Sequence, residues 1–313
     1  MSRYLIQKVL SLIPVLLGIS LIAFVLGVIS PGNPAEIALS QGGYEPTQEQ
    51  IETLEQQMGL DAPYAVQYVR WVGRVLTGDL GTSYHSQRAV GEELARRLPV
   101  TLKLAACAMV VACVTGIAMG CLSAAYRGRW PDRLIKTWIN IQLSVPAFWL
   151  ALGLILLFAE TLGWLPTSGN GGLRYMVLPA VVLSSASAAM AARLTRSALL
   201  AEFGKQYCTA AAARGIRPWR LVICNALPNA IVPTVALLGN SLGGMLGGSV
   251  IVESIFALPG IGSYALEAIS NRDYPALQGY VLLAGAIYVG VTLLVDTASM
   301  VLNPKVRLER RSI

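Results

Sequence analysis

Long runs without charged side chains alternate along the chain with short segments that hold most of the charges. A helix that crosses about 30 Å of hydrocarbon needs about 20 apolar residues, and each of these runs reaches or approaches that length. The pattern predicts six membrane-spanning helices, at Val9–Ile29, Leu104–Tyr126, Thr137–Ala159, Tyr175–Ala192, Leu221–Val252 and Tyr274–Val295. The fifth run is long enough to hold a span plus a bend or half-helix, which leaves a seventh element open.

The segment between the first two spans, residues 31–98, has the polar composition of a part outside the membrane. It predicts a first helix over Pro46–Met58, with Thr47 as its N-cap and carboxylates in the early turns. A second helix is predicted over Pro63–Leu76, because apolar side chains recur there at spacings of three and four residues. This stripe consists of Tyr64, Tyr68, Trp71 and Val75, and it fits packing against a neighbour or the membrane surface, or docking of a partner.

Composition agrees with an all-α polytopic membrane protein, since the chain is 55% hydrophobic and only 13% charged. The net charge of +7 does not indicate a nucleic-acid partner, because the basic residues lie at the membrane edges without interleaved aromatic side chains. Anionic lipid headgroups are the partner that these charges predict.

The basic residues also predict the orientation. If Met1 is cytoplasmic, the inner segments hold 16 of the 24 Lys and Arg residues and only three acids, Asp132, Glu202 and Glu309. Both termini are then cytoplasmic. The expected organisation is an N-terminal helix (1–30), an extracytoplasmic helical insertion (31–98), a five-helix core (99–303) with a cytoplasmic loop (193–220), and a basic tail (304–313).

The sequence lacks the residues that disulfides, metal sites, catalytic sites and nucleotide-binding loops need. The five cysteines lie in or beside the spans, where they fit core packing, and His85 is the only histidine, so we expect no disulfide and no metal site. The sequence shows no nucleophile paired with a base, so we expect no catalytic residue and disfavour a membrane enzyme. The sequence has no GxxxxGK[ST] loop, so we expect it neither to bind nor to hydrolyse ATP and to bind no cofactor.

Glycines repeat every four residues in two spans, at Gly116 and Gly120 in the second and at Gly239, Gly243 and Gly247 in the fifth. Glycine lets two helices approach closely, so the pattern predicts helix packing. Flexible helices of a gated pathway are the alternative, to which Pro146 and Pro233 would contribute. Asn240, polar and central in the fifth span, is a candidate pathway residue, and an interhelical hydrogen bond is its other interpretation.

Ion-coupled transport is disfavoured because ionisable groups within the spans are few. Asp296 is the one acid clearly inside a span, and a structural partner among the basic residues that follow it is favoured over a proton relay. A secondary transporter therefore remains a distant alternative, and the energy for transport should come from another protein.

The segment Tyr207–Val235 predicts where that protein binds. Ala210–Ala213 form a helical surface with little side chain, Gly215 ends the helix, and Arg214, Arg217 and Arg220 surround it, so a partner's groove could close on it. The segment resembles the coupling loop of binding-protein-dependent ABC importer permeases, in which Glu-Ala-Ala, three residues, Gly, nine residues, Ile, one residue and Leu-Pro follow one another. Ala210, Ala211, Gly215, Leu227 and Pro228 match this pattern, whereas Thr209 replaces its Glu and Asn225 its Ile.

The rest of the chain resembles the peptide/nickel class of these permeases, through RYLIQKVLSLIPVLLGIS, GLDAPYAVQYVRW, DLGTSYHSQRAV, SVPAFWLA and IVESIFALPGIGSYALEAISNRDYPALQG. The SQRAV and NRDYP neighbourhoods favour nickel, or a nickel or other metal chelate, as the cargo. Dipeptide and oligopeptide permeases share most of these motifs and give the alternative.

The resemblance implies a type I ABC importer permease fold in the inner membrane of a bacterium. It also implies three kinds of protein partner: a homologous second permease, two ATP-binding subunits that use ATP and magnesium, and a solute-binding protein outside, beside the membrane lipid that the charges predict. The residues that it assigns to coupling are Thr209, Ala210, Ala211, Arg214, Gly215, Leu227 and Pro228. Asn240, Gly243, Gly247 and Pro146 are the expected pathway residues.

Overall fold

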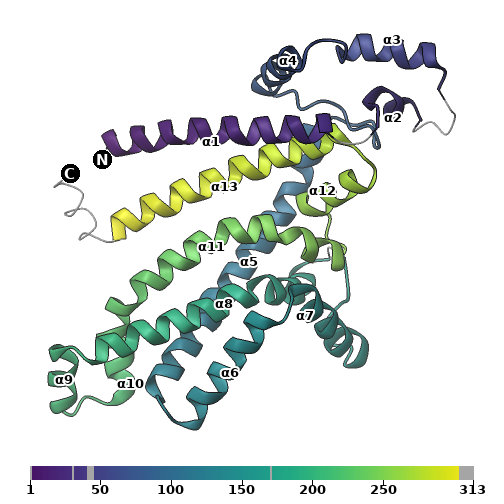
Figure 1. Cartoon of the computed structure of the whole chain (residues 1–313). Coiled ribbons are helices and arrows are strands. Elements are labelled where there is room, and N and C mark those ends of the chain that lie inside the picture. The colour runs from purple at the N-terminus through teal and green to yellow at the C-terminus, as the bar shows by residue number, and fades with distance from the viewer. Residues whose placement is uncertain (1, 30–31, 41–45, 170, 303–313) are drawn as a thin grey trace. The chain divides into compact units, whose positions relative to one another are not determined.

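The computed structural model describes residues 2–29, 32–40, 46–169 and 171–302, and these residues form helices and connecting turns (Figure 1). The helices are α1 (Ser2–Ile29), α2 (Pro34–Ser40), α3 (Gln48–Met58), α4 (Tyr64–Leu76), α5 (Val90–Ala125), α6 (Trp130–Ser144), α7 (Ala147–Leu154), α8 (Leu173–Phe203), α9 (Gln206–Ala213), α10 (Pro218–Arg220), α11 (Leu227–Ile255), α12 (Ile261–Ser270) and α13 (Tyr274–Leu302), with π-helical turns η1 (Ile155–Thr161) and η2 (Leu221–Ala226). The chain divides into two compact units. Unit 1 is Met1–Thr101 with Pro259–Val289, and unit 2 is Leu102–Leu258 with Gly290–Ile313.

Five continuous helices in the described part of the chain are long and apolar enough to cross a membrane, namely α1, α5, α8, η2 with α11, and α13. The third predicted span is broken into two helices, because α6 and the α7–η1 helix are bent by 110° relative to each other. Pro146 causes the break. A proline disfavours helical backbone at the residue before it, and Val145 is extended, with φ −85° and ψ 124°. The bent pair supplies a sixth span only if its two helices count as one.

α8 forms the centre of unit 2 and packs against α6, α7 and α11 (Figure 1). The glycine pair of α5 lies in a close helix contact, which fits the predicted packing role, and its partner is α8. A Cβ atom on Gly116 would lie 2.7 Å from the Cβ atom of Ala191, and one on Gly120 would lie 2.5 Å from that of Thr195. α5 also extends back to Val90, so one helix crosses the expected border between residues 98 and 99.

In unit 1, α4 packs against α1 with the predicted apolar stripe. The rings of Phe24 and Tyr68 meet edge to face at 5.4 Å, Trp71 is buried beside them, and Val75 packs on the same cluster. The hydroxyls of Ser20 and Tyr68 are 2.8 Å apart. The stripe is therefore mainly a packing surface for the first span. Tyr64, its outermost member, is exposed. Thr47 caps α3 through a capping box with Gln50, as expected.

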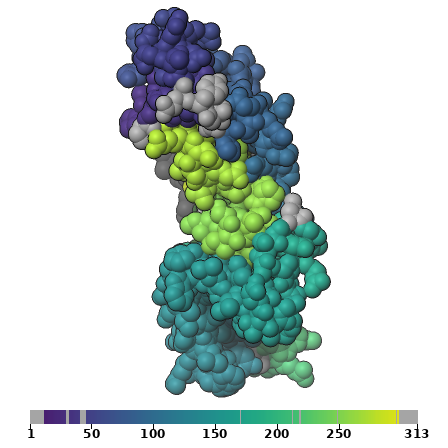
Figure 2. Space-filling view, turned by 90° about the vertical axis from the view of Figure 1, so that its right-hand side faces the viewer, coloured from purple at the N-terminus to yellow at the C-terminus, as the bar shows by residue number. Residues whose placement is uncertain are grey.

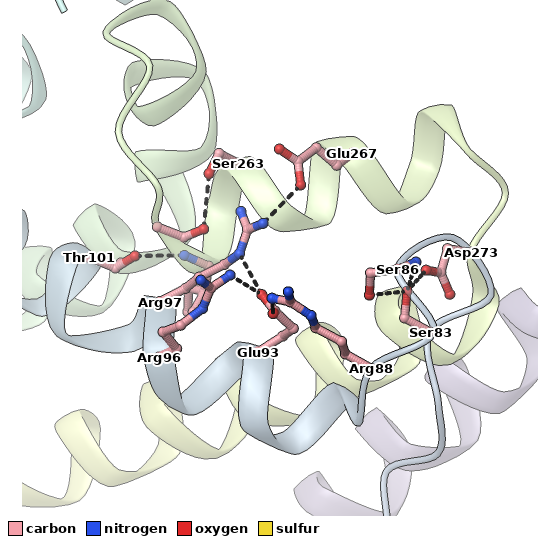
Figure 3. A network of polar contacts seen from close by, with 12 residues as sticks. Ser83, Ser86, Arg88, Glu93, Arg96, Arg97, Thr101, Ser263, Glu267 and Asp273 are labelled. Atoms are coloured by element: carbon pink, nitrogen blue, oxygen red, sulfur yellow. Dashed lines mark hydrogen bonds and ion pairs between the residues drawn. The ribbon is translucent and has the colours of Figure 1, made fainter. Parts of the chain in front are cut away.

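Two buried carboxylates fix the insertion to the C-terminal part of unit 1. Asp273 accepts hydrogen bonds from the Ser83 hydroxyl at 2.5 Å and from the Tyr84 amide at 3.2 Å. Arg88, Arg96 and Arg97 converge on Glu93, and Arg97 also reaches Glu267 at 3.2 Å (Figure 3). These bonds join the segments DLGTSYHSQRAV and NRDYP, which stand far apart in the sequence.

Candidate functional site: the loop between α8 and α11

The loop between α8 and α11 is a short helical elbow. α9 ends at Ala213, and Gly215 follows it with φ +77°, in the left-handed region that L side chains rarely adopt. The amide of Ile216 returns to the carbonyl of Ala211 at 3.4 Å, and α10 starts at Pro218. Gly215 thus ends the helix, as the sequence predicted, and its conformation is the reason that glycine is favoured there.

α9 has one buried and one exposed face. Cys208 is buried in an apolar cluster with Leu199, Val222 and Ala226. Ala211, one turn further along, is buried too. The opposite face carries Thr209, Ala210, Ala213, Arg214 and Gly215, all of which are exposed. The elbow therefore presents a surface of small side chains, and the exposed Arg217 and Arg220 lie on the turn that follows.

A polar chain holds α9 against the helices on either side of it. Glu202, near the end of α8, is bound by Lys205 Nζ at 2.5 Å and accepts a hydrogen bond from the Tyr207 hydroxyl at 2.5 Å. Asn229 of α11 donates to the Tyr207 oxygen at 3.3 Å. The bond to Glu202, together with burial, raises the pKa of Tyr207 to about 12, so the hydroxyl keeps the proton that it donates.

The remaining motif positions have different environments. Leu227 is half-buried and packs on the same apolar cluster, whereas Pro228 is exposed in the first turn of α11. The hydroxyl of Thr209, in the place of the family's glutamate, donates to the carbonyl of Lys205, the residue just before α9, at 3.4 Å. Its hydroxyl offers a partner no charge, so an ion pair through this position does not carry over.

The expected pathway residues do not form one group. Asn240 and Gly247 are exposed on one face of α11, together with Gly244 and Ile251, whereas Gly243 is buried. Pro146 is exposed at the break between α6 and α7. The side chain of Asp296 lies outside the described ones, and so does the tail after residue 302.

Sequence reasoning missed Asp132, which it counted only as an acid in a basic segment. The carboxylate is fully buried and accepts two hydrogen bonds from Arg196, at 2.9 and 3.0 Å. It accepts two more, from the Ser123 hydroxyl at 2.6 Å and the Gly128 amide at 2.9 Å. Asp132 therefore fixes the connection between α5 and α6 to α8. A lone acid among basic residues was the available signal.

No group of three or more His, Cys, Asp or Glu side chains that could hold a metal ion occurs in the part of the chain that the structure describes. The five cysteines are free thiols.

Two family models together cover nearly the whole chain. Residues 116–308 match the binding-protein-dependent transport system inner membrane component, and residues 1–105 match the N-terminal part of such membrane components. The chain belongs to this family of ABC importer permeases. It is therefore a transport subunit of the inner membrane with the type I permease fold, and not an enzyme. Permeases of this family work with a second permease, ATPase subunits and a binding protein.

Similar proteins agree with this assignment. The permease is 38% identical to the glutathione transport system permease protein GsiC of Salmonella paratyphi A, over 98% of this chain and 99% of that protein. The GsiC protein of Pectobacterium atrosepticum is also 38% identical, with the same coverage. An inward-facing MetNI methionine ABC transporter has a chain with the same fold, at a TM-score of 0.57 and 22% identity, covering 67% of the permease and 96% of that chain.

Proposed function

We propose that the permease forms half of the translocation pathway of an ATP-driven importer for small peptide-like solutes, with glutathione as the first cargo to test. Identity of 38% over nearly the full length to permeases of glutathione transport systems carries this proposal. The motif resemblance favoured nickel or a metal chelate. The relatives support the peptide-like alternative better.

The elbow around Gly215 is the part that receives the work of the ATPase. Its exposed face is small enough for a groove to close on it, and its buried face packs on the ends of α8 and α11. The chain Glu202–Tyr207–Asn229 makes the same connection with hydrogen bonds. A push on α9 would thus move both helices together. Since the ATPase subunits are cytoplasmic, this loop and both termini are cytoplasmic too.

The exposed face of α11 borders the pathway in this proposal. Asn240 supplies a polar group on that face, and Gly244 and Gly247 leave room, because no other element in the described part of the chain comes within 4 Å of a Cβ atom built on either glycine. The second permease would close the pathway on the other side.

Transport by the complete importer tests the cargo. Proteoliposomes with both permeases, the ATPase subunits and the binding protein should take up labelled glutathione only when ATP is present. Labelled dipeptide and nickel(II) serve as the competing cargoes. ATP-dependent uptake of nickel(II) without uptake of glutathione would reject the peptide-like proposal, and uptake driven by an ion gradient alone would reject the ABC mechanism.

Two substitutions at one position test the coupling role. Gly215→Trp should reduce ATP-driven uptake about tenfold or more, which corresponds to about 1.4 kcal/mol, because the bulky side chain stands in the contact with the ATPase. Gly215→Asn is the matched control, since asparagine tolerates left-handed backbone, and it should keep most of the uptake. Both variants bear the strain of a left-handed side chain, about 1–2 kcal/mol at most, and should still insert, because the turn is exposed and no described neighbouring element crowds it. Normal uptake with Gly215→Trp would refute coupling through this elbow while leaving the cargo assignment untouched.

A further inference from the structure

α4 has an apolar flank that stays exposed beside the described residues of unit 1. Its inner face, with Tyr68 and Trp71, packs on Ala23 and Phe24 of α1. At 100° per residue, the adjoining flank of the helix, its outer face, carries only apolar residues or glycine, all of them exposed, and the exposed Arg70 lies just beyond Val66 at the border of this face. They are Ala65, Val66, Val69, Gly73 and Leu76, with exposed fractions of 68% at Val69 and 82% at Leu76. Part of the α2–α4 segment is visible in purple and blue in the space-filling view (Figure 2).

The polar side chains of α4 occupy a single flank. Gln67, Arg70 and Arg74 lie at spacings of three and four residues, and all three line a cavity of about 800 Å³ between α4, α3 and the end of α1. α4 contains no acidic residue. Water in the cavity can solvate this flank, so the helix can have an apolar medium on its outer face without burying a charge.

The contacts with α1 place α4 at the height of the membrane. Phe24 lies five residues before Ile29, the last residue of the first span, which is roughly 8 Å along a helix. Ser20, which meets the Tyr68 hydroxyl, lies about 13 Å from that end. The contacts thus run along the C-terminal half of the first span, so a flank of α4 that faces away from the protein there meets lipid, and tyrosine and tryptophan are enriched toward the ends of such spans.

We propose that α4 is an interfacial membrane helix, with Val66, Val69 and Leu76 in contact with acyl chains of the leaflet at the C-terminal end of α1. The occupant is lipid because α4 lies beside a spanning helix, its outer face is free of polar groups, and its cations open to a separate aqueous cavity. The insertion is thereby held to the membrane surface by a helix as well as by the spans. A protein on this face is the competing occupant.

Accessibility of a spin label decides between lipid, water and protein. The label is attached at Val69→Cys, with the five native cysteines replaced by alanine, in the complete importer in phosphatidylethanolamine/phosphatidylglycerol nanodiscs. Glu52→Cys on the exposed, polar α3 is the control. The ratio of oxygen to NiEDDA collisions should be several-fold higher at position 69 than at position 52. An equal ratio, which indicates water, overturns the proposal, and so does low access to both reagents, which indicates a protein contact.

A second measurement keeps all native cysteines in place. The photoreactive residue benzoylphenylalanine at position 69 or 76 should yield lipid adducts and no protein crosslink after illumination of the complete importer. A crosslink to any other subunit, or to a second copy of this chain, would overturn the proposal.

Discussion

Replacing Asp132 with alanine is expected to destabilise the permease by about 3–5 kcal/mol, the cost of removing one partner from a buried ion pair. The carboxylate is fully buried and takes both hydrogen bonds of the Arg196 fork. Its loss also leaves the hydroxyl of Ser123 and the amide of Gly128 without an acceptor. The connection between α5 and α6 would then come away from α8, the central helix of unit 2.

The thermal stability of purified permease measures this effect. Asp132→Ala should lower the melting temperature strongly, and the double variant Asp132→Ala with Arg196→Leu should recover part of the loss, because it leaves no unpaired guanidinium. Glu160→Ala removes an exposed carboxylate and serves as the control, with little expected change. If Asp132→Ala and Glu160→Ala melt at the same temperature, the buried pair does not stabilise the fold.

The features predicted correctly from the sequence are local ones. Apolar runs of membrane length, the Thr47 cap and the stripe of α4 each depend on residues within a few turns of one another. The break after Val145 escaped prediction because composition does not distinguish a proline that kinks a span from one that ends a helix.

Long-range polar pairs could not be predicted either. Asp132 and Arg196 are 64 residues apart, and Ser83 and Asp273 are 190 apart. Hydrophobic periodicity carries no information on which helices become neighbours. The positive-inside rule, which gave Asp132 its only interpretation, assigns little weight to acids.

The candidate site likewise has local features that the sequence predicted and long-range contacts that it did not. The run of alanines predicted the exposed surface of small side chains. Gly215 predicted the end of the helix, because in that run only a glycine takes a φ of +77° without strain. Glu202, Tyr207 and Asn229 belong to different helices in the structure, and their hydrogen bonds join those helices. The sequence therefore predicted the exposed surface of the elbow but not its attachment to the core.

The close contact of α5 with α8 gives the second large effect. Gly120→Leu is expected to cost about 3 kcal/mol or more, at the upper end for an overpacked core, because a Cβ atom there would lie 2.5 Å from Thr195 Cβ and 2.8 Å from the Ala192 carbonyl oxygen. A backbone oxygen cannot rotate away, so the two helices must separate.

The amount of folded permease in the membrane and its melting temperature measure this cost. Gly153→Leu in α7 makes the same chemical change where no atom lies within 4 Å, and it should have little effect. Gly120→Ala should fall between the two, since it adds the clashing carbon alone.

Next to Gly120, Cys121 and Ala124 pack on the cluster that holds the buried face of α9. If α5 separates from α8, the molecules that still fold should therefore also show reduced ATP-driven uptake. If Gly120→Ala gives the wild-type uptake per folded molecule, the elbow does not depend on the contact between α5 and α8.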